Sequence, residues 1–259
     1  MTNSNLQYAI YPSLKGRRVL ITGGATGIGE SFVTSFAEQG AQVAFFDIQD
    51  DAANQVATQL ATNGHPKPHY LHCDMTDVYQ VRESIARAID LLGGLDVLVN
   101  NAGNDQRHSI EEVTPELWDK LMAVNLRHQF FVTQAALPAL KQSGSGSIVN
   151  MSSIAWMIPG TNMPVYITAK AAIVGLTRTL AHEVGKDNIR VNAILPGAIL
   201  TEKQRRLWVT PEYSAEILAN QALKRHLHPE EVARLALFLA SEDASAITGQ
   251  SHIVDGGWA

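Results

Sequence analysis

The sequence predicts an α/β fold, with one doubly wound sheet of seven mainly parallel strands flanked by helices. Short apolar runs alternate with helical patterns almost from end to end, which is typical of such folds. Several runs, such as Val97-Leu98-Val99, are apolar without interruption, as in parallel strands that are covered on both faces. A glycine-rich turn also joins the first run directly to the first helical pattern.

The expected strands are short, and the helices between them carry recognisable end signals. Gly40 ends the first helical pattern and Gly93 ends another, because glycine accepts the left-handed backbone at a helix C-terminus. Pro115 and Pro229 each stand at the first position of a helix. The seven expected strands are Arg18–Thr22, Gln42–Asp47, Pro68–Cys73, Asp96–Asn100, Ser147–Ser152, Arg190–Leu195 and His252–Val254.

We expect the whole chain, 1–259, to form a single domain, because no low-complexity linker or fixed-period repeat divides it. One stretch, 196–228, shows no regular pattern and is too long for a simple connection. We therefore expect 196–228 to act as a lid over a bound substrate.

Composition and charge exclude several classes of partner. The chain has 259 residues, of which 46% are apolar, and its net charge of −5 gives no reason to expect nucleic acid or an anionic membrane as partner. No apolar run approaches the roughly 18 residues of a membrane span, and residues 1–13 lack the layout of a signal peptide. The single cysteine, Cys73, cannot form an internal disulfide, so we expect a cytoplasmic protein. Histidine and cysteine show no zinc-site spacing, so no metal is expected.

The glycine-rich turn carries the first chemical signal. Gly23, Gly27 and Gly29 remove side chains where the chain must turn, and they let backbone amides approach a pyrophosphate. The helix that follows offers its N-terminal amides and its dipole to the same negative charge. A tight strand–helix connection alone would also use glycines, but the place of this turn in the first βα unit favours a Rossmann-type dinucleotide site.

Asp47 ends the next expected strand, eighteen residues after Gly29. A carboxylate there can accept hydrogen bonds from the ribose hydroxyls of NAD and would repel the 2′-phosphate of NADP. No lysine or arginine stands beside it, since Ile48 and Gln49 follow. We therefore expect NAD as the cofactor. Asp74 is a weaker candidate, for contact with the adenine ring, and capping of a helix is its alternative role.

Tyr166 and Lys170 are four residues apart in a helical pattern, so their side chains lie on one face, one turn apart. A free tyrosine has a pKa near 10 and is a poor base at neutral pH. A neighbouring lysine ammonium favours the phenolate and should lower the pKa of Tyr166, as should a positive nicotinamide ring. By itself a Tyr-x-x-x-Lys pair is more often plain helix surface.

Five motifs follow one another along the chain: Thr22-Gly23-x-x-x-Gly27-x-Gly29, Asn100-Asn101-Ala102-Gly103, Ser153, Tyr166-x-x-x-Lys170 and Pro196-Gly197. Their order resembles that of the classical short-chain dehydrogenases/reductases, from about Leu14 to the C-terminus.

This resemblance implies roles for four catalytic residues. Tyr166 would transfer the proton, and Lys170 would lower the pKa of Tyr166 and hold the nicotinamide ribose. Ser153, thirteen residues before Tyr166, would orient the substrate oxygen, whereas Ser152 would be structural. Asn125 would hold a water that links Lys170 to solvent. The implied cofactor-binding residues are Gly23, Thr26, Gly27, Ile28, Gly29, Asp47, Ile48, Asp74, Met75, Asn101, Ala102, Gly103, Tyr166, Lys170, Pro196, Gly197, Ile199 and Thr201.

Further stretches resemble the bacterial aldose 1-dehydrogenases within the same family. They are residues 10–16, 101–108, 125–128 and 208–212. The resemblance implies oxidation of the anomeric hydroxyl of a sugar such as xylose, galactose, arabinose or fucose to the lactone, with reduction of NAD. A dehydrogenase of another secondary alcohol, a polyol, a steroid or a 3-oxoacyl chain is the alternative, and a silent NAD-binding relative is a third hypothesis.

Polar and indole side chains near the expected site also suit a polyhydroxylated ring, because each sugar hydroxyl needs a hydrogen-bond partner. Arg107 and His108 could instead pair with Asp105 or Arg127, 202–206 could be a solvated helix face, and Trp208 could anchor the lid. The expected substrate residues are Asn104, Asp105, Ser153, Trp156, Asn162, Met163, Tyr166, Gln204 and Trp208.

The family resemblance also implies a homotetramer, formed through the two long helices that carry Asn125 and Tyr166. Both are apolar over much of their length, as in Phe130-Phe131-Val132 and 171–174. An apolar surface of that kind would be unusual on a monomer.

Overall fold

The computed structural model describes residues 8–259, in which seven parallel strands form one sheet in the order β3-β2-β1-β4-β5-β6-β7. All six strand pairs are parallel, so the predicted sheet is confirmed and has no antiparallel edge. The order runs outward in opposite directions from β1 and β4, which places a topological switch point between these two strands. The strands are β1 (Arg18–Thr22), β2 (Gln42–Asp47), β3 (His69–His72), β4 (Val97–Asn100), β5 (Gly146–Met151), β6 (Ile189–Pro196) and β7 (Ser251–Val254).

Several strand ends differ from the prediction by one residue. β3 begins at His69, the first residue that pairs with β2, rather than at Pro68, which has no backbone N–H to contribute. β5 ends before Ser152, although the amide of Ser152 still donates to the carbonyl of Ile194 at 2.9 Å. β6 is longer than expected and extends through Pro196.

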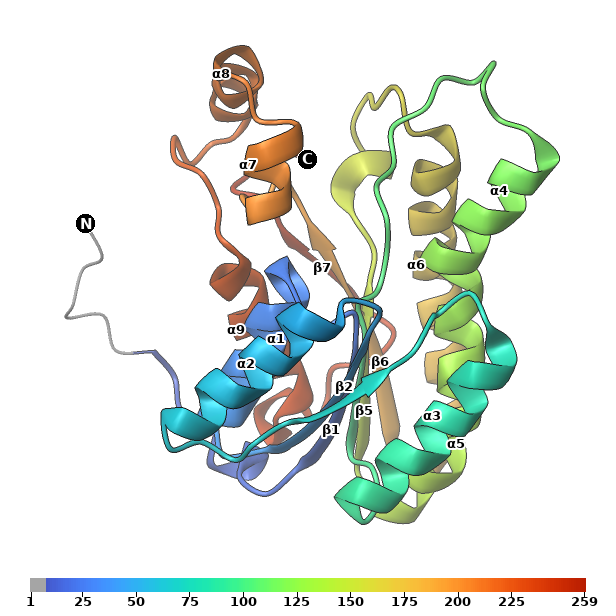
Figure 1. Ribbon diagram of the computed structural model, residues 1–259, viewed down its shortest axis with the longest axis vertical. Coiled ribbons are helices and arrows are strands. Elements are labelled where there is room, and N and C mark those ends of the chain that lie inside the picture. The colour runs from blue at the N-terminus through green and yellow to red at the C-terminus, as the bar shows by residue number, and fades with distance from the viewer. Residues whose placement is uncertain (1–7) are drawn as a thin grey trace.

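Helices cover both faces of the sheet, as Figure 1 shows. Side chains alternate along a strand, so Val19 and Ile21 of β1 pack on one face and Leu20 packs on the other. The first face is covered by α1 (Gly27–Glu38), α2 (Asp50–Thr62) and α9 (Pro229–Ala240), and the second by α3 (Val78–Leu92), α5 (His128–Ser143) and α6 (Pro164–Val184).

The predicted helix ends are confirmed. Gly93 follows α3 with a left-handed φ of 69°, and its backbone amide donates to the carbonyls of Asp90 and Ile89 at the end of that helix. Pro115 begins α4, where the side chain of Thr114 accepts a hydrogen bond from the amide of Leu117 at 3.2 Å. Pro229 begins α9. Between α4 (Pro115–Met122) and α5 the chain forms one π-helical turn, η2 (Ala123–Arg127).

The segment 196–228, expected to be irregular, contains two short helices above the carboxyl ends of the strands (Figure 1). Thr201 and Thr210 cap them, each accepting a hydrogen bond from an amide three residues later. A bridge between Ile199 and Leu227 ties the two ends of the segment together. The helices are α7 (Glu202–Leu207) and α8 (Pro211–Asn220).

No helix in residues 8–259 is long and apolar enough to cross a membrane. Within the same residues, no three histidine, cysteine, aspartate or glutamate side chains form a group that could hold a metal ion.

Candidate active site

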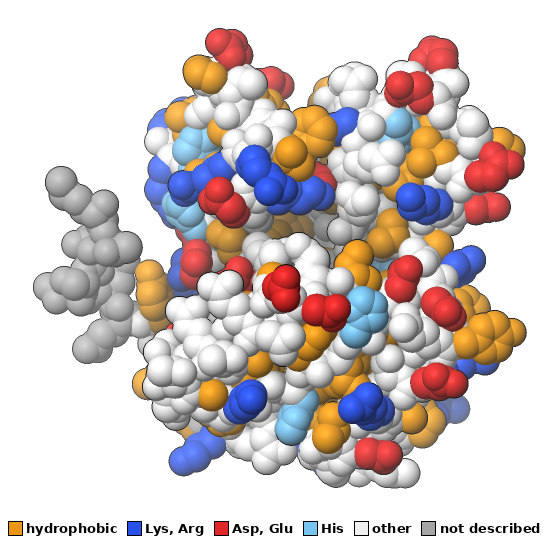
Figure 2. Space-filling model, viewed as in Figure 1, with side chains coloured by type: hydrophobic (Ala, Val, Ile, Leu, Met, Phe, Trp, Pro, Cys, Tyr) orange, Lys and Arg blue, Asp and Glu red, His pale blue; other side chains and the backbone are white. Residues whose placement is uncertain are grey.

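Loops that follow β1, β4, β5 and β6 meet at one edge of the sheet, where α6 also begins. This edge is the carboxyl end of the strands, the usual place for ligands in open α/β sheets. The surface there is hollowed between the part that carries α7 and α8 and the part that carries the loop before α4 (Figure 2).

Tyr166 and Lys170 lie on one face of α6, as their spacing predicts. The Nζ atom of Lys170 is 5.5 Å from the centre of the Tyr166 ring. Only 3% of Lys170 is exposed, and its Nζ donates a hydrogen bond to the carbonyl of Met151 at 2.8 Å. Burial lowers the pKa of Lys170 to about 8, because desolvation disfavours the ammonium, and the negative charge of Asp105 partly opposes this.

The pKa of Tyr166 does not move in the direction predicted from Lys170. It is raised to about 12, first because burial disfavours the phenolate and then because Asp105 is negative. A hydrogen bond with Ser153 and the charge of Arg107 act in the opposite direction. The residues of the chain alone therefore keep Tyr166 a phenol.

Asn125 lies in the π-helical turn η2 and is fully buried. Its Oδ1 accepts from the amide of Asn104 at 2.8 Å, while its Nδ2 donates to the carbonyls of Asn104 and Leu121, each at 3.0 Å. A Cβ on Gly103 would lie 3.1 Å from this Oδ1 and 3.5 Å from the Nζ of Lys170. The predicted neighbours Asn125 and Lys170 thus meet at Gly103.

Ser153 and Ser152 take different places. The hydroxyl of Ser153 accepts from the amide of Ala155 at 3.1 Å, and its interaction with Tyr166 lowers the pKa of that phenol. The hydroxyl of Ser152 donates to the carbonyl of Lys170 at 2.6 Å, so this side chain fixes the backbone of α6. Only Ser153 lies beside the phenol, as the sequence analysis expected.

The turn after β1 has the geometry of a phosphate cradle. Gly23 and Gly27 adopt left-handed φ angles of 68° and 60°. A Cβ on Gly29 would lie 1.7 Å from the carbonyl oxygen of Gly23, so no larger residue fits there without a backbone shift. Thr26 precedes α1 without a side-chain cap, which leaves the first amides of the helix open to an anion. These residues fit a dinucleotide pyrophosphate.

Asp47 braces this turn from the end of β2. Its Oδ2 accepts from the amide of Ala25 at 2.9 Å, and its Oδ1 accepts from the amides of Ile48 and Gln49 at 2.8 and 3.0 Å. The carboxylate is held against the glycine turn, at the position expected for a ribose-binding acid.

The other expected cofactor residues border the same edge, but some serve mainly the fold. Asn101 donates from Nδ2 to the carbonyls of Thr22 and Gly23, which joins the loops after β1 and β4. Met75 and Ile199 have their side chains buried in the apolar core, so only their backbones could face a ligand. Ile28 lies in the first turn of α1, and Thr201 caps α7. The remaining ones occupy the ends of strands or the residues that directly follow them: Ala102, Pro196 and Gly197.

Asp74 does not cap a helix, contrary to its alternative role. Its Oδ1 accepts from both the amide and the hydroxyl of Thr76 at 2.8 Å, which forms a local turn. Asp77 caps α3 instead, by accepting from the amides of Tyr79 and Gln80.

Asp105, in the loop after β4, contacts α7. Its Oδ1 accepts from the Nζ of Lys203 at 2.6 Å, and its Oδ2 accepts from the Nε2 of Gln204 at 2.7 Å. Lys203 also reaches the side-chain oxygen of Asn104 at 3.4 Å. The alternative that 202–206 form a solvated helix face is therefore correct only in part, because Lys203 and Gln204 point toward Asp105 in the site.

Arg107 contacts Met163 and Trp208 rather than pairing with Asp105 or Arg127. Its Nη1 lies 2.7 Å from the Sδ of Met163, and its guanidinium carbon is 5.3 Å from the centre of the Trp208 ring. These contacts join the loop after β4 to the segment before α6 and to the end of α7.

His108 and Asn162 connect the same two segments through their backbones. The amide of His108 donates to the carbonyl of Asn162 at 2.9 Å, and Asn162 has a left-handed φ of 61°, which is uncommon outside glycine. The ring of His108 bonds the carbonyl of Gln106 at 3.0 Å. Trp156 stands apart, since it is 38% exposed on the short helix η3 (Ile154–Trp156).

Sequence reasoning missed His128, the first residue of α5. Its Nε2 lies 3.0 Å from the carbonyl of Ala102, and only 1% of the residue is exposed. Burial, followed by the charge of Lys170, lowers the pKa of His128 to about 3, so the ring is neutral. An isolated histidine carries no motif, and its place in the stretch 125–128 was the one available signal in the sequence.

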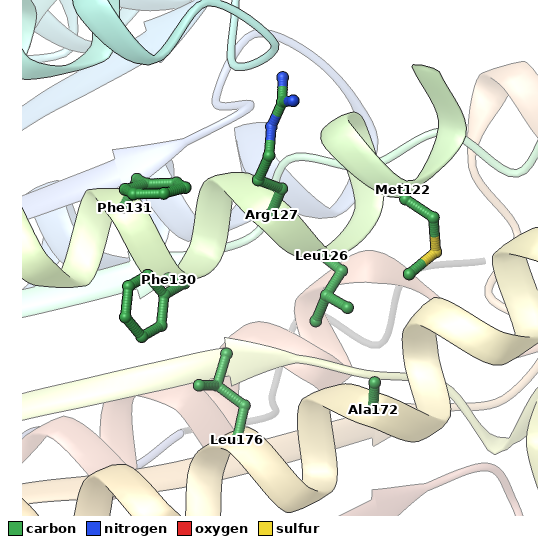
Figure 3. A pocket seen from close by; sticks show the side chains of 7 residues that line it. All are labelled: Met122, Leu126, Arg127, Phe130, Phe131, Ala172 and Leu176. Atoms are coloured by element: carbon green, nitrogen blue, oxygen red, sulfur yellow. The ribbon is translucent and has the colours of Figure 1, made fainter. Parts of the chain in front are cut away.

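An apolar groove of about 420 Å³ lies elsewhere, between α6 and the η2–α5 segment (Figure 3). None of the residues expected to bind cofactor or substrate lines it. We therefore assign the chemistry to the strand ends rather than to this groove. Its lining residues are Met122, Leu126, Arg127, Phe130, Phe131, Ala172 and Leu176.

Comparison with known proteins agrees with this geometry. A family model described as enoyl-(acyl carrier protein) reductase matches residues 23–259. The chain is 48% identical to a "probable galactose dehydrogenase" of Rhizobium meliloti, over 95% of this chain and 96% of that protein. It is 47% identical to a D-xylose 1-dehydrogenase of Caulobacter vibrioides, over 96% of this chain and 98% of that protein. A solved 7α-hydroxysteroid dehydrogenase, complexed with NADH and 7-oxo glycochenodeoxycholic acid, is 34% identical with a TM-score of 0.90, over 95% of this chain and 96% of that one.

The glycine cradle leads to a first prediction. Gly29→Ala should weaken NADH binding by about tenfold or more, because its Cβ would push against the Gly23 carbonyl and displace the amides that face the pyrophosphate. Calorimetric titration with NADH measures this. Gly185→Ala is the matched control, because Gly185 has a φ of −59° and nothing within 4 Å of an added Cβ. Equal NADH affinity in the two variants would contradict the assignment of the cradle.

Proposed function

The chain belongs to the short-chain dehydrogenase/reductase family, and from this membership we propose that it is an NAD-dependent aldose 1-dehydrogenase. It would transfer a hydride from the anomeric carbon of an aldose to the cofactor and release the sugar lactone. The observation that carries the proposal is the meeting of Tyr166, Lys170 and Ser153 at the strand ends, in a chain whose relatives include sugar dehydrogenases.

Each catalytic residue would have one task. A bound nicotinamide supplies the hydride acceptor. The Oη of Tyr166 takes the proton from the anomeric hydroxyl, and the Ser153 hydroxyl holds the sugar oxygen beside it. The Lys170 ammonium favours the phenolate and binds the nicotinamide ribose, and the positive ring of the oxidised cofactor would also lower the pKa of Tyr166 from its value of about 12. Asn125 would hold a water next to Lys170.

The preference for NAD over NADP would rest on Asp47. Its carboxylate is positioned by three backbone amides and so cannot turn away from a 2′-phosphate. Like charges brought that close would repel each other. Ile48, beside it, is 61% exposed and offers no cation to a phosphate.

The sugar would lie between the loop after β4 and α7. Asp105, Gln204 and Asn104 present polar groups there, and a site that hydrogen-bonds hydroxyls rejects analogues that lack them. The segment 196–228 would act as the lid over it. A steroid or another secondary alcohol is the second candidate, because the 7α-hydroxysteroid dehydrogenase has the same fold. Among aldoses, galactose, xylose, arabinose and fucose are the first to test.

A panel of substrates tests the proposed activity. NADH formation, followed by absorbance, should appear with NAD and one or more aldoses, and not with acyclic polyols or hydroxysteroids. Tyr166→Phe should lower the rate by roughly 10²–10⁴-fold, because the general base is lost, and should leave NADH binding intact. Tyr79→Phe is the control, since Tyr79 is 78% exposed on α3. Turnover of a hydroxysteroid alone would favour the second candidate, and tight NAD binding without any turnover would favour a silent relative.

Cofactor choice gives a separate prediction. Asp47→Ser should raise the ratio of kcat/KM for NADP to that for NAD by about tenfold or more, because the repulsion of the 2′-phosphate is removed. Asp90→Ser removes the same charge at the far end of α3 and should leave the ratio unchanged. An unchanged ratio in Asp47→Ser would exclude Asp47 as the discriminating residue.

We also propose that the enzyme is a cytoplasmic homotetramer. The one cysteine, Cys73, is free and buried, which suits a reducing compartment. The groove between α6 and the η2–α5 segment joins Leu126, Phe130 and Leu176 into an apolar surface, and Phe130 is 43% exposed (Figure 3). A second copy of this chain, with the same helices, would cover it.

Light scattering should therefore give a mass about four times the chain mass of 28.1 kDa. Leu176→Asp should produce smaller species, because a charge would be buried in the interface. Leu91→Asp, at a 46% exposed residue of α3, is the control and should keep the tetramer. A monomeric mass for the unchanged protein would exclude this assembly.

A further inference from the structure

The ion pair between Lys203 and Asp105 crosses the site from α7 to the loop after β4. The Nζ–Oδ1 distance is 2.6 Å, and the side chain of Asp105 is 18% exposed while that of Lys203 is 47% exposed. The carboxylate is thus largely withdrawn from water and depends on its partners in α7. Figure 2 shows Lys and Arg side chains gathered on the surface around α7, so a negative group facing this helix is attracted to it.

Asp105 also acts on the catalytic pair. Its charge raises the pKa of Tyr166 and that of Lys170, so it opposes formation of the phenolate. Lys203 and Arg107 in turn hold the pKa of Asp105 below its usual value, against the effect of burial. Asp105 therefore remains negative near a tyrosine that must itself become negative.

The charged and titratable groups around Tyr166 come from four elements. Lys170 is on α6, Asp105 and Arg107 are in the loop after β4, and Lys203 is on α7. His128 of α5 is buried and neutral beside Lys170. Of the cations in this set, Lys203 is the one bound directly to the carboxylate, and it belongs to the proposed lid.

We propose that Lys203 is a positioning residue that acts through Asp105: it offsets the carboxylate's charge when α7 lies against the loop after β4, and so allows Tyr166 to take the proton from the sugar. The inference rests on the proposed function, because it concerns the base of that reaction. It goes beyond that function because it makes the ionisation of Tyr166 depend on whether α7 lies against the loop after β4. Without the Lys203 side chain at Asp105, only the more distant charge of Arg107 would offset the negative carboxylate in the active site.

The sign of the effect follows from the charges. For the oxidation of a sugar, kcat/KM should rise with pH as Tyr166 becomes a phenolate. Removing Lys203 leaves Asp105 negative, so the phenolate is disfavoured and this rise moves to higher pH. Replacing Asp105 by Asn removes the negative charge, so the same rise moves to lower pH. Both substitutions break the same contact between α7 and the loop, yet they should move the profile in opposite directions. A purely structural role for the ion pair would not produce opposite shifts.

The experiment measures kcat/KM for the best aldose with saturating NAD across pH, in the holoenzyme. Lys203→Met should move the rise upward by roughly 0.5 pH unit, which lowers kcat/KM about threefold at a pH below it. Asp105→Asn should move it downward, whatever it does to KM for the sugar. In Lys203→Met combined with Asp105→Asn, the effect of losing Lys203 should largely disappear. Lys203→Arg keeps the charge and should restore the original profile.

Arg205→Gln is the matched control, because it removes one positive charge from an exposed position of α7 and should leave the rise in place. Shifts in the same direction for Lys203→Met and Asp105→Asn, or no shift in either, would overturn the proposal.

A second readout does not need an active substrate. The near-ultraviolet absorbance of tyrosinate, taken as each variant minus its Tyr166→Phe counterpart with NAD present, reports the ionisation of Tyr166 directly. It should show the same opposite shifts. If no aldose is turned over, the proposed function fails, while this titration still decides for or against the coupling.

Discussion

The burial of the Lys170 ammonium is the constraint on which the site depends. Only 3% of the residue is exposed, and a buried charge is stable only when polar partners replace its water. The carbonyl of Met151, at the end of β5, provides one partner at 2.8 Å. Because Lys170 is on α6, this hydrogen bond and the one from the Ser152 hydroxyl to the Lys170 carbonyl both hold the helix against the end of β5, and Tyr166 lies one turn away on the same helix.

Other features of the fold make room for this ammonium. Gly103 lies between Lys170 and the carboxamide of Asn125, where a Cβ would crowd the Asn125 Oδ1 at 3.1 Å and would touch the Lys170 Nζ at 3.5 Å. Asn125 can reach that point because the chain widens into a π-helical turn before α5, a distortion that often occurs at functional sites. His128 then begins α5 and stays neutral, so that no second positive charge is buried beside Lys170. The glycine, the π-helical turn and the neutral histidine thus all lie around the Lys170 ammonium.

The sequence predicted the sheet, the glycine turn and the meeting of Tyr166 with Lys170, because each depends on local periodicity or spacing. It did not predict contacts that depend on how distant segments pack, such as that between Asp105 and Lys203, 98 residues apart. The direction of the pKa shift of Tyr166 was wrong for the same reason: burial and the charge of Asp105 come from tertiary structure and outweigh a neighbour on the same helix. Short-range alternatives also misled, since Asp77 rather than Asp74 caps α3.

A tyrosine whose pKa is raised to about 12 is well suited to a reaction that should proceed only in the assembled complex. If Lys170 alone ionised the phenol, the base would be charged whether or not a sugar and cofactor were in place. Here burial keeps the proton on Tyr166, and charges that arrive with the cofactor or lie on α7 must counteract both burial and Asp105. The negative charge of Asp105 opposes ionisation of Tyr166, and it thereby makes that ionisation depend on groups outside α6.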